Sequence, residues 1–224
     1  GNNVDAKGNS SIAIGADDWD TVAVKTVEGT GKTVKEVYQD YTGDVMETGS
    51  YTHTTSSEAA VAIGTKSQAI GQLSTAFGTG TIAEGVASAA FGIGAKATKG
   101  NSVAIGAGST TTTDAIEVNE ATVNNLKYSG FAGGNRITSG DQVSFGSSGY
   151  ERQLKNVAPG EISNTSTDAI NGSQLYAVQN VLGNTAQTVK DVLGGNAKLA
   201  EDGSITMSNI GNTGAGNIHD AIKS

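Results

Sequence analysis

A short motif that recurs at a fixed spacing constrains this chain more than any other feature. Each copy is a run of small and apolar residues that ends in glycine: AVAIG (60–64), STAFG (74–78), SAAFG (88–92) and SVAIG (102–106). The four glycines lie 14 positions apart. Ala69, Ala83 and Ala97 follow such a glycine by five residues, SIAIG (11–15) is a further copy, and QVSFG (142–146) is a divergent last copy.

This period is too short for a helical repeat, which needs roughly 30 or more residues. Within a copy, Ala60 and Ala62 fall on one side of the chain, whereas Val61 and Ile63 fall on the other, as in a β-strand. The recurring glycine indicates a corner at which φ becomes positive. We therefore expect two short strands per turn, with each turn stacked on the next in a β-roll.

The repeat also predicts self-association. Both faces of the strands carry uncharged small or apolar residues, so both faces should be covered. One thin roll cannot cover both of its own faces, and the second face should therefore contact other chains. We predict a buried ladder in the roll core from the bulky residues that share one phase of the repeat: Ile63, Phe77, Phe91 and Ile105.

Composition excludes several functional classes. Only 14 residues are Lys or Arg and the isoelectric point is near 4.7, which argues against a nucleic-acid partner. No apolar run is as long as a transmembrane helix, which needs about 18 residues. The chain also has no cysteine for thiolate chemistry. His53 and His219 are its only histidines. We expect no catalytic residue, no cofactor and no metal.

The copies SIAIG, AVAIG and SVAIG in a 14-residue period resemble the YadA-like head repeat of trimeric autotransporter adhesins. The resemblance implies a homotrimer in which three left-handed parallel β-rolls form one head. The expected fold is therefore mainly β: a trimeric left-handed parallel β-roll head with a hairpin insertion, then a neck and a short trimeric coiled coil.

Two insertions, about 16–59 and 110–141, interrupt the predicted head, which spans residues 1–151. Residues 21–27 and 32–41 alternate like strands, so the first insertion is predicted to be a hairpin, as in the head inserts of the family. Its aromatic residues are candidate ligand contacts, because exposed aromatics are frequent binding hot spots. The alternative is that they pack the hairpin onto the trimer. They are Trp19, Tyr38, Tyr41 and Tyr51.

Residues 152–174 are similar to the neck of the family. The residues that carry this resemblance are Asp168, Asn171, Gly172, Ser173, Gln174 and Leu175. We predict a helix that starts near Asp168, with Ser166 or Thr167 as its N-cap, and that stops at Gly194 and Gly195.

The predicted stalk, 175–193, allows two coiled-coil registers. A hydrophobic seam follows alternating three- and four-residue spacing through Leu175, Val178, Leu182, Thr185, Val189 and Val192. Val181, Asn184 and Thr185 instead fit the VxxNTxx motif of the family, which implies that Asn184 holds an anion on the threefold axis. Both registers cannot hold throughout, and we favour the hydrophobic one. In the connector, 194–224, Asp202 and Gly203 predict a hairpin, and Asn217 predicts the cap of a last helix.

The resemblance implies a non-enzymatic bacterial adhesin that mediates attachment and autoaggregation or biofilm formation. Its partners would be extracellular-matrix proteins of the collagen, fibronectin or laminin class, the host cell surface, and sister fibres. The family anchors in the outer membrane through a C-terminal barrel that we do not find in this sequence, so we expect a piece of a longer surface fibre. Two alternatives remain: a structural spacer without a ligand site, and a β-solenoid enzyme.

Overall fold

The computed structural model describes residues 3–224. The chain divides into two compact units, of which the first ends at Leu154 and the second runs from Lys155 to Ser224. No helix among the described residues is long and apolar enough to cross a membrane.

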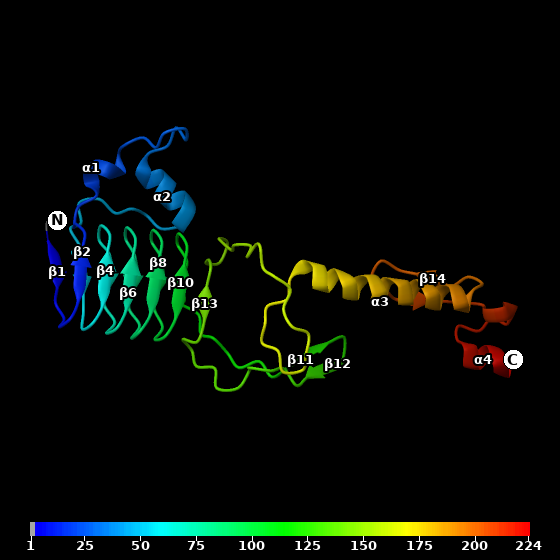
Figure 1. Cartoon of the computed structure of the whole chain (residues 1–224). Coiled ribbons are helices and arrows are strands. Elements are labelled where there is room, and N and C mark those ends of the chain that lie inside the picture. The colour runs from blue at the N-terminus through cyan, green and yellow to red at the C-terminus, as the bar shows by residue number, and fades with distance from the viewer. Residues whose placement is uncertain (1–2) are drawn as a thin grey trace. The chain divides into compact units, whose positions relative to one another are not determined.

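The first unit is a roll of two parallel sheets, as the 14-residue period predicts (Figure 1). The six-stranded sheet contains β2 (Ile12–Ile14), β4 (Val61–Ile63), β6 (Thr75–Phe77), β8 (Ala89–Phe91), β10 (Val103–Ile105) and β13 (Val143–Ser144). The five-stranded sheet contains β1 (Val4–Ala6), β3 (Thr54–Ser56), β5 (Gln68–Ala69), β7 (Ile82–Ala83) and β9 (Lys96–Ala97). Both outlying copies belong to the roll, because Ile12 pairs with Val61 and Val143 pairs with Val103.

The corners of the roll use left-handed backbone, which confirms the expected role of the recurring glycine. Gly64 has φ 134° and Gly106 has φ 107°. A Cβ on Gly64 would lie 2.3 Å from the carbonyl oxygen of Gly78 in the next turn. Glycine therefore meets two requirements here, the positive φ and the close stacking of turns.

The core of the roll consists of alanine rather than of the predicted bulky ladder. Ala62, Ala76, Ala90 and Ala104 of the six-stranded sheet are fully buried, and so are Ala69, Ala83 and Ala97 of the five-stranded sheet. Buried hydroxyls share this interior, where the Ser67 Oγ lies 2.9 Å from both the carbonyl oxygen of Ala76 and the Thr81 Oγ1. The space between the two sheets thus accommodates only small side chains.

The ladder prediction is therefore wrong about the side on which these residues lie. Ile63, Phe77, Phe91 and Ile105 do align in register along the sheet. They point out of the protomer, where Phe77 is 52% exposed, while Ile63 is half-buried. The physical reason is the narrow interior: the alanine phase fills it, and the strand alternation turns the bulky phase outward.

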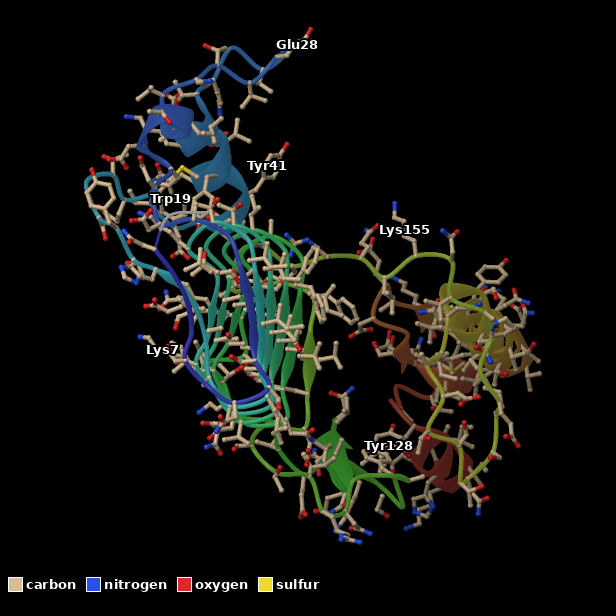
Figure 2. The ribbon with its side chains drawn as sticks, turned by 60° about the vertical axis from the view of Figure 1, so that its left-hand side comes forward. Lys7, Trp19, Glu28, Tyr41, Tyr128 and Lys155 are labelled. Carbon is tan, nitrogen blue, oxygen red and sulfur yellow. The ribbon has the colours of Figure 1, made fainter. Side chains whose placement is uncertain are left out.

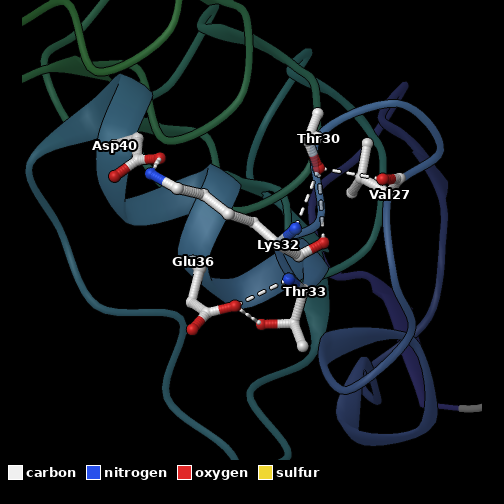
Figure 3. Close-up of polar contacts among 6 residues, drawn as sticks. All are labelled: Val27, Thr30, Lys32, Thr33, Glu36 and Asp40. Atoms are coloured by element: carbon white, nitrogen blue, oxygen red, sulfur yellow. Dashed lines mark hydrogen bonds and ion pairs between the residues drawn. The ribbon is translucent and has the colours of Figure 1, made fainter.

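The first insertion is helical, which corrects the predicted hairpin. It forms α1 (Asp20–Ala23) and α2 (Val34–Thr42), and only a Thr26–Thr33 bridge pairs its two arms. The Glu36 carboxylate accepts hydrogen bonds from the Thr33 backbone N–H at 2.7 Å and from its hydroxyl at 2.6 Å (Figure 3). This capping box starts α2, and Gly43 with φ 76° ends it.

The second insertion contains an antiparallel hairpin of β11 (Glu120–Val123) and β12 (Leu126–Ser129). It begins later than predicted, because the roll continues past residue 109. Thr110 still bridges to Lys96, and Thr111 is fully buried.

The second unit is dominated by α3 (Gly172–Leu193), which ends before Gly194 as expected. Its N-cap is Asn171 rather than Ser166 or Thr167, because Asn171 and Gln174 form a capping box and the preceding residues are not helical. The remaining elements are β14 (Lys198–Leu199), β15 (Ile205–Thr206), the 3₁₀ turn η1 (Ile210–Asn212) and α4 (Ile218–Lys223). Strands β14 and β15 form the predicted hairpin, and the Asn217 side chain caps α4.

Candidate functional site

Two of the four candidate aromatics fix the first insertion to the roll. Trp19 is 8% exposed and Tyr38 is 6% exposed, with ring centroids 5.9 Å apart and a tilt of 58°. The Trp19 Nε1 donates to the carbonyl oxygen of Glu47 at 2.5 Å. Ala23 and Met46 complete this cluster. Trp19 and Tyr38 are therefore packing residues, and Figure 2 shows Trp19 where the insertion meets the roll.

A row of corner glycines lets the insertion approach so closely. A Cβ on Gly80 would lie 3.0 Å from the Tyr38 hydroxyl oxygen, and one on Gly94 would lie 2.8 Å from it. A Cβ on Gly108 would lie 2.5 Å from the Thr42 Cα. Successive turns of the roll thus present bare backbone on which α2 lies.

Tyr41 and Tyr51 remain available to a ligand. Tyr41 is 60% exposed on the outer side of α2, and Tyr51 is 56% exposed in the segment that returns to the roll. In Figure 2 the Tyr41 side chain projects away from the roll, and Glu28 marks the tip of the insertion.

Lys66 occupies the corner position that Gly80, Gly94 and Gly108 occupy in the following turns. Its φ is 56°, a left-handed conformation that is uncommon for a lysine. The residue is only 4% exposed, its Nζ lies 4.2 Å from the Trp19 ring centroid, and it donates to the carbonyl oxygen of Ser50. Burial lowers the pKa of Lys66, against the opposing effect of Asp20, Asp18 and Asp17. The sequence did not mark Lys66 as a site residue. The signal that could have found it is its position 14 residues before Gly80, where the repeat otherwise has glycine.

The outward face of the six-stranded sheet is an ordered apolar surface of the first unit. A column of bulky side chains crosses it, with Ile14 at 59%, Phe91 at 40% and Ile105 at 39% exposure. The side chains align turn by turn, so the surface is regular and uncharged along this column. Such a patch is typical of a protein interface.

The neck residues form a hydrogen-bonded junction within one chain. The Asn171 Nδ2 donates to the carbonyl oxygen of Val157 at 3.0 Å, and its Oδ1 accepts from the Ser173 hydroxyl at 2.8 Å. The Gln174 side chain accepts from the Gly160 N–H at 3.0 Å and donates to the Gly160 carbonyl at 2.7 Å. These amide side chains attach the preceding loop to the first turn of α3.

Two further neck residues have different surroundings. The Asp168 carboxylate accepts from the Glu161 N–H at 3.0 Å, so it belongs to the same junction. Leu175 is 54% exposed, and a Cβ on Gly172 would meet nothing within 4 Å. The junction thus leaves its apolar residue, Leu175, exposed in the protomer.

Helix α3 has no buried residue in the protomer. Leu182 is 67% exposed on the hydrophobic seam, and Val181 is 65% exposed on the competing one. Asn184 is exposed as well. Since neither seam is covered, the register and the anion site at Asn184 remain predictions.

Among residues 3–224, no group of three or more His, Cys, Asp or Glu side chains is placed to hold a metal ion. His53 is partly exposed and its Nδ1 lies 2.7 Å from the Asp5 carboxylate. This bond lowers the pKa of Asp5.

Comparison with known protein families gives two matches. The coiled stalk of trimeric autotransporter adhesins matches residues 153–198, and the YadA head domain repeat matches residues 56–81 and 83–109. These segments contain nearly all of the neck, the whole of α3 and the regular turns of the roll.

Among individual proteins, the chain is similar to the trimeric autotransporter adhesin AtaA of Acinetobacter sp. (strain Tol 5), with 47% identity over 72 residues. It is also similar to the autotransporter adhesin BtaE of Brucella suis, with 42% identity over 70 residues. The matches cover 32% and 31% of this chain, but only 2% and 9% of those relatives. The solved C-terminal YadA-like domain of a Burkholderia pseudomallei protein is 36% identical, covers 50% of this chain and 51% of that chain, and has a TM-score of 0.43.

Proposed function

Because this chain carries the head repeats and the coiled stalk of the trimeric autotransporter adhesins, we propose that it acts as a homotrimeric, non-enzymatic adhesin at the bacterial cell surface. The relatives named above are adhesins, which as a class perform no catalysis. Attachment to host matrix proteins or cells, autoaggregation into biofilm and anchoring in the outer membrane belong to this proposal.

The observation that carries the proposal is the exposed apolar column on the six-stranded sheet. Phe77 and its aligned neighbours are large apolar groups on a regular surface that a lone protomer leaves in water. Burying such a column between three copies would stabilise the head by roughly 25 cal/mol for each Å² of apolar area removed from water. In the second unit, burial of the exposed apolar seams of α3 would also require further copies of the chain.

Assembly through that sheet would leave the five-stranded sheet on the outside of the head. Its outward column contains Gln68, Ile82 and Lys96 in register, beside buried alanines. This repeated, weakly charged surface suits an extended fibrous ligand, because many weak contacts on three copies add up through avidity. We therefore propose the roll surface as the contact for fibrous matrix proteins.

The test is the binding of the whole chain to immobilised collagen, fibronectin and laminin. A matched variant replaces residues 17–58 with a short corner of the repeat type. We expect this variant to remain trimeric and to keep most of its affinity. A folded, trimeric variant that loses more than about tenfold, or about 1.4 kcal/mol, would move the contact to the insertion, where Tyr41 and Tyr51 are exposed. No binding by the unaltered chain would favour a structural spacer.

A further inference from the structure

A cleft of about 510 Å³ lies between the first insertion and the five-stranded sheet. Gln68, Ile82 and Lys96 form its floor, one residue from each of three successive strands. The segment 43–52 of the insertion contributes Asp44, Glu47 and other residues to its wall. The volume falls within the about 300–1,000 Å³ of small-molecule sites. Since this sheet lies opposite the apolar column, trimer assembly through that column leaves the cleft open.

Tyr38 lines this cleft, and its hydroxyl is free to pair with a ligand. Tyr38 is 94% buried, given its 6% exposure, and its hydroxyl has no hydrogen-bond partner among residues 3–224. Burial, with a smaller effect of the Asp44 charge, raises the pKa of Tyr38 to about 12, so the group remains a neutral hydroxyl. The hydroxyl oxygen keeps some contact with solvent, since it is not among the enclosed unpaired polar atoms of the described residues, and a bound ligand can supply the partner that it lacks within the chain.

The contacts of Lys66 connect the wall of the cleft to the roll. Lys66 holds a left-handed conformation at a corner where the next three turns have glycine. Its side chain contacts both the Trp19 ring and the Ser50 carbonyl oxygen, so it connects the corner to each side of the insertion. Lys66 is a positioning residue for a preformed cleft.

The charges in the cleft are already largely paired. The Lys96 Nζ lies 2.7 Å from the Asp44 carboxylate, and the Lys66 ammonium donates to the Ser50 carbonyl oxygen. The side chains of Gln68 and Glu47 have no hydrogen-bond partner in the described part of the chain, and both line the cleft. The free groups are therefore an amide, a carboxylate and a hydroxyl, which together both donate and accept.

We propose that this cleft binds a neutral saccharide unit. Each sugar hydroxyl both donates and accepts, so hydroxyls can donate to Glu47 and pair with Gln68 and with the Tyr38 hydroxyl. Ile82 and Val45 offer apolar surface to the C–H face of a sugar ring. An anionic ligand would face Asp44 and Glu47, and a purely apolar ligand would leave all of these polar groups unpaired.

The experiment is saturation-transfer difference NMR on the whole chain with the methyl glycosides of glucose, galactose, mannose and N-acetylglucosamine. We expect transfer to at least one of them. Tyr38→Phe removes only the unpaired hydroxyl and should weaken that binding by about fivefold, the effect of one neutral hydrogen bond. Tyr41→Phe is the matched control, since it makes the same change on the exposed side of α2, and it should have no effect.

Gln68→Ala is a second probe that does not touch the packed cluster, with the exposed Gln72→Ala as its control. If Tyr38→Phe alters the melting temperature, the comparison of Gln68→Ala with Gln72→Ala decides whether the sugar binds in the cleft. The proposal is overturned if no glycoside binds, if neither probe differs from its control, or if a polyamine such as spermidine binds in place of the sugars. Tyr38→Phe leaves the outward residues of the five-stranded sheet unchanged, so it should not alter matrix binding. A Tyr38→Phe variant that loses the sugar but keeps matrix binding separates the outcome of this proposal from that of the adhesin proposal.

Discussion

The roll and the helix α3 are stabilised in opposite ways. In the roll, Ala76 and the equivalent alanines are fully buried within one chain, and each strand pairs with the strands of neighbouring turns. In α3, which spans 22 residues, no residue is buried. One region thus builds an interior from its own turns, whereas the other leaves its apolar side chains exposed in the protomer.

Regular sequence spacing therefore has a different physical cause in the roll and in α3. In the roll, the 14-residue period repeats a backbone ladder, so the backbone hydrogen bonds are satisfied inside the protomer. In α3, the backbone is satisfied as well, but an isolated helix with Gly183 in its interior is marginal in water. The seam spacing therefore predicts contacts between chains.

The largest expected effect is that of Ala76→Asp, because it places an unpaired charge in the closed interior of the roll. We expect a loss of about 3–5 kcal/mol in the free energy of unfolding, independent of protein concentration. Circular dichroism during chemical denaturation measures it. A variant with an unchanged unfolding curve would mean that Ala76 does not face the interior.

The adjacent change Phe77→Asp should act on assembly instead. The side chain points outward, so the roll of each protomer should persist, while three carboxylates would be forced into the apolar interface. By sedimentation equilibrium, the mass should fall from about three times 22.4 kDa toward 22.4 kDa as the protein is diluted. Phe77→Leu is the control and should stay trimeric. A stable Phe77→Asp trimer would contradict the assignment of this face to the interface.

Gly94→Ala tests the close approach of α2 to the roll. The new Cβ would lie 2.8 Å from the Tyr38 hydroxyl oxygen, at φ +62°. Strain and overpacking together should cost about 2–3 kcal/mol. Gly49→Ala has a similar φ of +72° but nothing within 4 Å, so only about 1 kcal/mol of backbone strain is expected there. Fluorescence of Trp19, the only tryptophan, reports both. Equal losses would argue against a packed insertion.

Gly183→Ala should have the smallest effect and the opposite sign. A Cβ at Gly183 meets nothing within 4 Å in the protomer, and alanine is about 1 kcal/mol more favourable than glycine inside a helix. Helicity and melting temperature should therefore rise. Gly172→Ala, at the first residue of α3, should change them less. A loss of trimer in Gly183→Ala would instead reveal a neighbouring chain packed against this glycine.

The sequence was ambiguous where two periodicities overlap. Val34, Val37 and Tyr38 lie on one face of α2, yet residues 32–41 also alternate well enough to be read as a strand. The pair Thr33 and Glu36 was the local signal for a helix, because these residues form the capping box from which α2 starts. In α3, the same kind of box at Asn171 and Gln174 places the start later than the serine and threonine before it.

The 14-residue repeat by itself determined the parallel two-strand turns, the left-handed corners at Gly64 and Gly106, and the opposite faces of alternate residues. These follow from local rules, because backbone sterics and the strand period act within a few residues. Only the tertiary structure decided that Ala62 and Ala76 face inward while Ile63 and Phe77 face outward, since that choice depends on the distance between two sheets. It also decided that Lys66 replaces a corner glycine beneath Trp19, because the two residues meet only when the insertion lies on the roll.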